Sequence, residues 1–255
     1  MMLQAQNLHL TVPGKVLCQD LTLTLDAGQC WAILGKNGSG KTTMIQVLCG
    51  LAKPAAGQIL LDGKVLAGIP RRPLAQRIGV LLQEESTAFS GPVLDYVLLG
   101  RFPHAGSWRP DDSDLEAALQ ALKQTGMVQA QAQSFATLSG GERQRVRIAQ
   151  LLAQEPGILF LDEPLQHLDL PHQLAMMKLL REIAIGQRKT VIMVLHDIFW
   201  ASHFCSHTLL IHDDGKILSG ESTRMFSVDN METLYQCDFQ EIKTSDGNYF
   251  LPTLE

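Results

Sequence analysis

The feature that most constrains this chain is a glycine-rich segment, Gly35 to Thr42, which directly follows a short apolar run, Cys30–Leu34. The segment matches the pattern Gly-x-x-x-x-Gly-Lys-Ser/Thr at every fixed position. Glycines let backbone N–H groups turn inward around phosphate oxygens, and a helix that starts next adds the positive end of its dipole. A chance glycine-rich turn is the alternative, but an apolar strand before the loop and a helix after it favour nucleotide binding in an α/β fold.

Within this loop the residue types indicate which part of a nucleotide each would contact. We expect Lys41 to reach the β- and γ-phosphates and the Thr42 hydroxyl to ligate Mg²⁺. A helix carrying Thr43 to Leu51 should follow. The predicted nucleotide-binding residues of the loop are Gly35, Asn37, Gly38, Ser39, Gly40, Lys41, Thr42 and Thr43.

A second apolar run, Ile158–Leu161, ends in two carboxylates, Asp162 and Glu163. Parallel α/β sheets bind ligands at the carboxyl ends of their strands, so Asp162 is expected near the Mg²⁺ ion. Glu163 is the next residue and points elsewhere, where it could polarise a water molecule. A strand followed by solvated acids is the alternative, which the upstream glycine-rich loop disfavours.

A third segment, Leu138–Arg145, reads Leu-Ser-Gly-Gly-Glu-Arg-Gln-Arg. Ser139, Gly140 and Gly141 should open a helix, so free N–H groups and a hydroxyl would face an anion. An ordinary amphipathic helix capped by Ser139 is the alternative. The segment resembles the signature motif of the ABC (ATP-binding cassette) ATPases, and its place between the glycine-rich loop and Asp162 supports that resemblance. The nucleotide-binding residues that it implies are Ser139, Gly140, Gly141 and Glu142.

The resemblance covers nearly the whole chain and implies further roles. Gln83 matches the family's Q-loop glutamine, which senses Mg²⁺ and the attacking water. His196, after the Val191–Leu195 run, matches the switch histidine that hydrogen-bonds the γ-phosphate, and Leu168–Asp169 matches the end of the D-loop, which contacts the partner subunit. The resemblance implies ATP as nucleotide, with Glu163, His196, Gln83 and Lys41 as catalytic residues and Thr42, Gln83 and Asp162 as Mg²⁺ ligands.

Two positions depart from the family pattern. The family has an aromatic residue before its second strand that stacks on adenine, whereas this chain reads Leu10-Thr-Val-Pro-Gly-Lys15. Val12 or Pro13 would supply an apolar contact instead, so base selectivity should be weaker. The family also has Thr-Ser after the Glu-Pro pair, where this chain has Leu165 and Gln166.

The expected architecture is an α/β nucleotide-binding core with an N-terminal antiparallel β subdomain and an inserted α-helical lobe. Period-two alternation over Gln4–Leu25 predicts half-buried antiparallel strands, and the helical spacing from about residue 86 to 150 predicts the lobe. We assign one ABC ATPase domain to 1–255. Its parts are a catalytic core at 1–86 and 151–221, a helical signature lobe at 87–150, and a short C-terminal extension at 222–255.

Composition excludes several classes of function. The net charge is −5 without a block of like charges, so no nucleic-acid partner is indicated. No apolar run approaches the roughly 18–20 residues that span a bilayer, and no signal peptide is evident. The five cysteines are widely spaced, which favours reduced, mostly buried thiols over a zinc or redox site. His203 and His207 could pair on a helix as metal ligands, although a solvated or interface face is the simpler interpretation.

Cassettes of this family work as head-to-tail dimers, in which the loop of one copy and the signature of the other enclose each ATP. One motif of each kind implies a second copy of this chain, or a closely similar chain, as partner. Leu99–His104, Val12–Gly14 and Leu168–Gln173 resemble the importers of iron-siderophore, haem and cobalamin-like chelates. We therefore expect an importer ATPase acting as a translocase, peripheral on the cytoplasmic face of the inner membrane, with integral membrane permease subunits and, indirectly, a substrate-binding protein. A soluble cluster-assembly ATPase and an importer of another substrate class are the alternatives.

The family also has a groove that receives a short cytoplasmic helix of the membrane subunit. Its lining is expected just after Gln83 and at Leu99, Arg101 and Phe102, because an apolar anchor, an aromatic ring and an arginine dominate interface energetics. The alternative is that Phe102 belongs to the lobe core and Arg101 is a solvated charge.

Overall fold

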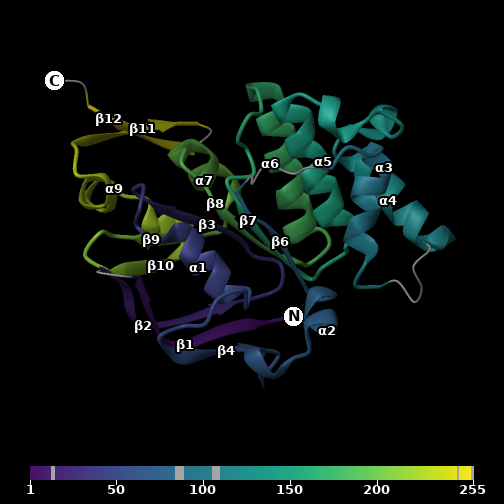
Figure 1. The fold of residues 1–255 in the computed structure, drawn as a ribbon. Coiled ribbons are helices and arrows are strands. Elements are labelled where there is room, and N and C mark those ends of the chain that lie inside the picture. The colour runs from purple at the N-terminus through teal and green to yellow at the C-terminus, as the bar shows by residue number, and fades with distance from the viewer. Residues whose placement is uncertain (13–14, 84–88, 105–109, 246, 254–255) are drawn as a thin grey trace. The chain divides into compact units, whose positions relative to one another are not determined.

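The computed structural model describes residues 1–12, 15–83, 89–104, 110–245 and 247–253 (Figure 1). The chain forms two compact units, which we call the P-loop unit and the signature unit. The P-loop unit consists of Met1–Ile69 and Leu180–Glu255, and the signature unit of Pro70–Leu179.

The P-loop unit contains an antiparallel sheet in the order β2-β1-β4-β5. Leu21, Leu23 and Leu25 are buried along β2 while Thr22 and Thr24 between them are exposed, so the alternating pattern produces the half-buried strands that it predicts. The strands are β1 (Leu3–Val12), β2 (Lys15–Leu25), β4 (Ala56–Leu61) and β5 (Lys64–Val65).

The same unit contains β3 (Cys30–Gly35), which pairs in parallel with β8 (Thr190–Val194) on one side and with β9 (His207–Ile211) on the other. Strand β10 (Ile217–Glu221) continues this part antiparallel to β9. All residues of β3 and β8 are buried, as continuous apolar runs require in a sheet covered on both faces. The apolar runs around residues 30–34 and 191–195 thus lie in neighbouring parallel strands.

Helices follow two of these strands. Helix α1 (Lys41–Leu48) follows β3 and α7 (Ile198–Phe204) follows β8. Helix α1 ends at Leu48 rather than at the predicted Leu51, because Gly50 has a φ of 80°, a left-handed conformation that terminates helices. The C-terminal part contains α8 (Ser222–Met225), α9 (Val228–Tyr235), β11 (Phe239–Thr244) and β12 (Gly247–Pro252).

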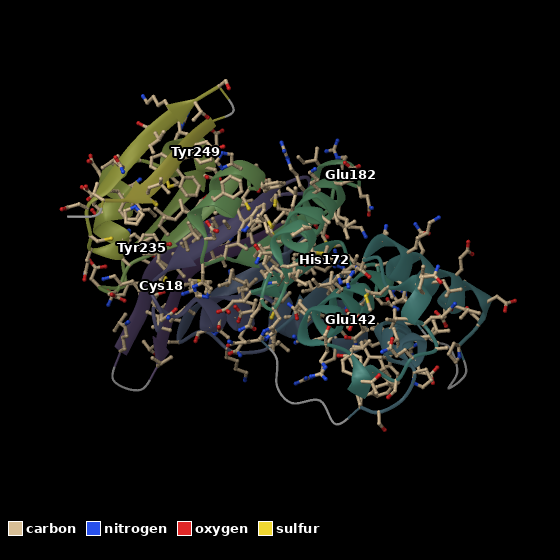
Figure 2. The ribbon with its side chains drawn as sticks, turned by 90° about the horizontal axis from the view of Figure 1, so that it is seen from above. Cys18, Glu142, His172, Glu182, Tyr235 and Tyr249 are labelled. Carbon is tan, nitrogen blue, oxygen red and sulfur yellow. The ribbon has the colours of Figure 1, made fainter. Side chains whose placement is uncertain are left out.

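The hairpin β11–β12 packs on helix α7. Tyr249 of β12 stacks on Phe199 with ring centroids 5.9 Å apart and contacts His203 at 4.8 Å, and its position beside α7 is visible in Figure 2. The two strands pair in antiparallel fashion, and Asp246 between them lies outside the described residues.

The signature unit combines a parallel strand pair with helices. Strand β6 (Ile78–Leu81) pairs in parallel with β7 (Ile158–Asp162), whose five residues are all buried. Helix α4 begins with a capping box between Asp111 and Asp114, and it packs against α5 (Figure 1). The helices are α2 (Arg71–Ala75), α3 (Val93–Leu98), α4 (Asp112–Gln124) and α5 (Gly140–Ala153), and α6 (Leu170–Ile185) begins in this unit.

The two compact units divide the chain near residues 69 and 179, whereas the sequence places the lobe at 87–150. Strands β6 and β7 thus cluster with the helices of the lobe, because β6 contacts α5 and α2 and pairs with β7. The functional division into core, lobe and C-terminal extension stays a prediction. Among the described residues, no helix is long and apolar enough to cross a membrane.

Candidate functional site

The glycine-rich loop joins the end of β3 to the start of α1. The buried Lys41 side chain folds back over the loop, and its Nζ donates hydrogen bonds of 2.8 Å to the carbonyl oxygens of Gly35 and Lys36. These bonds fix a positive charge against the backbone of the loop. The loop is therefore held in shape by its own lysine.

Two glycines give this loop its curvature. Gly38 and Gly40 have φ values of 77° and 99°, in the region where other residues are strained. The loop also contains a buried hydroxyl, because Ser39 Oγ has no hydrogen-bond partner among the described residues. A Cβ atom at Gly35 would lie 2.6 Å from that oxygen. Left-handed glycines, a fixed ammonium and an unsatisfied hydroxyl suit an anion such as a phosphate.

A charged group outside the motif also contacts the loop. Lys15, at the start of β2, donates from its Nζ to the carbonyl of Gly38 at 3.2 Å and lies 3.7 Å from a carboxylate oxygen of Asp213. Lys36 lies 3.8 Å from the second oxygen of Asp213. Sequence reasoning missed Lys15 and Asp213, because a lysine beside a turn and an acid in a hairpin carry no spacing signal.

His196 follows β8, and its side chain is exposed. The next residue, Asp197, caps α7 by accepting a hydrogen bond of 2.8 Å from the backbone N–H of Phe199. His196 also lines an open pocket together with Phe199 and Tyr249. The predicted switch histidine thus stands at a strand end and is accessible to a ligand.

The signature segment begins helix α5 with a capping box. Glu142 Oε2 accepts hydrogen bonds from the Ser139 backbone N–H at 2.9 Å and from its hydroxyl at 2.7 Å, and the Glu142 N–H donates back to Ser139 Oγ at 3.3 Å. The bonds from Ser139 hold the pKa of the Glu142 carboxyl below its ordinary value. Ser139 caps the helix, as the capped-helix interpretation of the sequence predicts. Its N–H and hydroxyl, two donors at the helix start where the sequence predicts an anion, bind the carboxylate of Glu142. Figure 2 labels Glu142 on α5.

The two glycines of the signature lie against His167. A Cβ atom on Gly141 would lie 2.8 Å from the His167 backbone oxygen, and one on Gly140 would lie 3.4 Å from the histidine Cβ. His167 itself has a φ of 64°. The backbone of His167 lies so close to position 141 that a residue with a Cβ atom would not fit there without a shift.

The carboxylates after β7 differ in their surroundings. Asp162 is the last residue of β7 and is buried, while Glu163 is half-buried and has a φ of 52°. A left-handed Glu163 turns the chain sharply, so the two side chains leave the strand in different directions. Gln83 lies beyond the end of β6 and is exposed.

Sequence reasoning missed two residues of α5 that contact these segments. The Gln144 side chain donates to the carbonyl of Pro164 at 3.1 Å, and Arg147 donates to the carbonyl of Leu82 at 2.6 Å. Their separation on the helix puts both on one face, which is a signal that helical spacing could have given.

The D-loop segment ends at α6. Asp169 accepts a hydrogen bond from the His172 ring, and this bond and one from the His172 backbone hold the pKa of Asp169 below its ordinary value. The Leu165 carbonyl accepts from the Leu168 N–H at 3.2 Å, so this tight turn is closed by its own backbone.

The predicted membrane-subunit groove needs one correction. Arg101 is only 8% exposed, with its Nε 2.9 Å from Asp114 and its Nη1 2.7 Å from Glu155. It is neither a surface anchor nor a solvated charge, because two carboxylates and the Ala153 carbonyl satisfy it inside the signature unit. Leu99 and Phe102 are 49% and 70% exposed, so Phe102 is not lobe core. Residues 84–88, also expected in this lining, lie outside the described residues, as does Pro13.

The cysteines and the His203–His207 pair, considered above as a zinc, redox or metal site, form no such site among the described residues. Cys18, Cys30, Cys49 and Cys205 are buried and free, Cys237 is exposed and free, and burial raises the pKa of Cys49 to about 11. His203 lies in α7 and His207 in β9, so they do not share a helix. Within the described ranges, no group of three or more His, Cys, Asp or Glu side chains could hold a metal ion.

Comparisons with known proteins show which family this sequence resembles. The ABC transporter family matches residues 18–166. The ferric enterobactin transport ATP-binding protein of Escherichia coli K12 is 35% identical over 91% of this chain and 86% of its own length. The hemin import ATP-binding protein of Pseudomonas entomophila is 40% identical over 82% of this chain and 83% of its own length.

Solved structures share the fold. An inward-facing metal-chelate type ABC transporter superposes with a TM-score of 0.86 and 30% identity over 99% of this chain and 98% of that chain. The dimeric bacterial ABC transporter cassette MJ0796 gives a TM-score of 0.75 and 27% identity over 86% of this chain and 98% of that chain. The predicted ABC ATPase fold is confirmed, and the chain belongs to the ABC transporter family.

Proposed function

We propose that this chain is the ATP-hydrolysing subunit of an ABC importer whose substrate is a metal chelate such as an iron-siderophore or haem. The observation that carries the substrate class is the similarity, over most of the chain, to ATP-binding proteins named for ferric enterobactin, hemin and iron(3+)-hydroxamate import. The complete set of phosphate-binding loop, signature segment, Asp162–Glu163 pair and His196 supports the ATPase activity.

In this proposal the phosphate-binding loop holds ATP. Lys41 exchanges part of its bonding to Gly35 and Lys36 for the β- and γ-phosphates, and the buried Ser39 hydroxyl and the N–H groups of the loop donate to phosphate oxygens. The residues that we assign to this role are Gly35, Asn37, Gly38, Ser39, Gly40, Lys41, Thr42 and Thr43.

Magnesium fits the donor set of the proposed site. Thr42, Gln83 and Asp162 would hold the ion, since a hydroxyl, an amide and a carboxylate supply the oxygen ligands that Mg²⁺ prefers. When bound, the ion would neutralise charge on the phosphates.

For hydrolysis we assign the base or water-positioning role to Glu163. His196 hydrogen-bonds the γ-phosphate and Gln83 orients the attacking water. Ser139, Gly140, Gly141 and Glu142 of a second copy contribute N–H and hydroxyl groups to the same nucleotide.

The proposed assembly contains two copies of this chain on integral membrane permease subunits, at the cytoplasmic face of the membrane. The related cassette MJ0796 is a dimer, which supports the head-to-tail arrangement. The exposed Leu99 and Phe102 are the proposed contact with the permease, because apolar and aromatic side chains anchor interfaces. Arg101 is excluded from this contact and instead braces the segment from inside.

Two experiments test the proposal. Glu163→Gln should keep ATP binding, slow hydrolysis severely and trap an ATP-bound dimer in size-exclusion chromatography, whereas a monomer under all conditions would contradict the dimer. Uptake of ⁵⁵Fe-labelled siderophore and of hemin by vesicles containing the copurified permease tests the substrate class. Transport of neither chelate, or copurification with cluster-assembly proteins instead of a permease, would overturn the importer assignment.

A further inference from the structure

A chain of hydrogen bonds joins helix α5 to both segments that carry proposed catalytic residues of the signature unit. Arg147 Nη2 donates to the carbonyl of Leu82 at 2.6 Å, and its Nη1 donates to Gln144 Oε1 at 2.9 Å. Gln144 Nε2 then donates to the carbonyls of Pro164 at 3.1 Å and Glu163 at 3.4 Å. We call this chain the α5 relay.

The residue types in the relay follow from its two ends. Both ends are carbonyl oxygens, which only accept hydrogen bonds, while a guanidinium only donates. The middle residue must therefore donate on one side and accept on the other, as an amide does. This requirement fixes the orientation of the Gln144 amide, because a flipped amide would face Arg147 with its donors and the carbonyls with its oxygen. Gln144 is buried, so an unsatisfied amide there would be costly.

The carbonyls that the relay binds belong to the peptide groups beside Gln83 and Glu163. The Leu82 carbonyl is in the same peptide plane as the Gln83 N–H, so its hydrogen bond sets where the Gln83 backbone lies. Glu163 has a φ of 52°, which a residue with a Cβ maintains only when surrounding bonds impose it. Gln144 bonds the two carbonyls immediately after that strained φ.

We propose that Arg147 and Gln144 are positioning residues that hold Gln83 and Glu163 in register with each other and with the signature helix. This inference rests on the proposed function, because it assigns Gln83 and Glu163 to hydrolysis. A movement of α5 would then shift the segments that carry Gln83 and Glu163 together. Loss of the bond from Arg147 or of the bonds from Gln144 would leave ATP bound but poorly aligned with the attacking water.

The test uses the purified full chain and compares Arg147→Met with Arg147→Lys. Met removes both hydrogen bonds with similar bulk, and Lys restores a donor toward Leu82. We expect Arg147→Met to lower kcat about ten-fold with KM for ATP within about two-fold, since small misplacements of reacting groups cost up to about a hundred-fold. Arg147→Lys should recover part of kcat. A purely structural role predicts instead a lower melting temperature with kcat unchanged per folded molecule.

A double-mutant cycle with Gln144→Leu tests whether the two residues act as one unit. A relay predicts that the double variant loses no more kcat than the worse single variant, whereas independent roles predict that the losses multiply. Arg101→Met is the matched control, since it removes another arginine of the same unit that contacts Asp114 and Glu155 rather than the catalytic segments. It should lower the melting temperature and leave kcat of the folded fraction unchanged.

Unchanged kcat in Arg147→Met, or a multiplicative double variant, would overturn the relay. Failure of the proposed function looks different: the unmodified chain would lack ATPase activity, or Glu163→Gln would retain it.

Discussion

The phosphate-binding loop and the signature segment are both glycine-rich turns that open a helix, yet they are prepared for an anion in opposite ways. In the P-loop unit, the ammonium of Lys41 bonds the loop backbone and the Ser39 hydroxyl is buried without a partner among the described residues. In the signature unit, the Ser139 hydroxyl and N–H are exposed and already bound by Glu142. The first segment thus contains a buried lysine and an unsatisfied hydroxyl, whereas the serine donors of the second segment are bound by a carboxylate of the same segment.

The physical difference is the source of the counter-charge. The loop already has a buried lysine at its centre, so a positive charge is in place for phosphate and Lys41 only has to exchange part of its bonding to the backbone. An exposed helix N-terminus capped by a carboxylate must exchange that carboxylate for phosphate, so it should bind weakly alone. From this asymmetry we expect ATP to bind the loop first and the signature segment of a second copy to engage it afterwards.

Removing Lys41 from the phosphate-binding loop should have the largest effect on ATP hydrolysis. Lys41→Ala deletes the buried charge of the loop, which Lys36 does not replace because it lies beside Asp213, so ATP hydrolysis should fall by at least about a hundred-fold. Turnover of the purified variant with its partner measures this, with Lys53→Ala, outside the motif, as control. Normal hydrolysis in Lys41→Ala would refute the assignment of the phosphate-binding loop.

Crowding the signature glycine tests the second segment. In Gly141→Ala the new Cβ would lie 2.8 Å from the His167 backbone oxygen, so the D-loop or the helix must shift. We expect ATPase activity to fall roughly ten-fold, given the cost of small misplacements at active sites, while equilibrium binding of ATP to the monomer stays unchanged. Weaker ATP binding by the monomeric variant would show that the two segments are not separable.

Supplying the missing aromatic ring should increase the affinity of the phosphate-binding loop's side of the site for ATP. Val12→Tyr should tighten ATP binding about five-fold or more, since stacking contributes roughly 1–3 kcal/mol per base in comparable sites. The unmodified chain should discriminate only weakly between ATP and GTP. Titration of both nucleotides against both proteins decides, and strong native preference for ATP would contradict the weak-selectivity prediction.

Neutralising the cap is the smallest expected change. Glu142→Gln keeps a side chain that can complete the capping box but removes the negative charge from the start of α5. ATP-dependent dimerisation should strengthen by about two- to five-fold, because a charge at a helix N-terminus is worth roughly 0.3–1 kcal/mol. Analytical ultracentrifugation in the Glu163→Gln background measures the dimer constant, and a weaker dimer would mean that the Glu142 carboxylate, and not only its backbone N–H, assists nucleotide binding.

The sequence alone determined much of this protein, because local pattern and motif spacing encode short-range geometry. The glycine spacing from Gly35 to Thr42 demanded a strand before and a helix after, the period-two alternation produced β1 and β2, and Ser139 was identifiable as a helix cap. Each of these features depends on residues that are neighbours in the chain, so no knowledge of distant contacts was needed.

Only the tertiary structure decided which distant groups meet. Arg101 resembled an interface residue in sequence, but Asp114 and Glu155 bury its charge inside the signature unit. Lys15 reaches Asp213, and Arg147 reaches Leu82, across separations for which the chain carries no periodic signal. Hydrogen bonds and ion pairs of this kind depend on where the two partners lie in space. The hydrophobic pattern of the sequence predicts the helices and strands, but the distances between polar groups are set only when these elements pack.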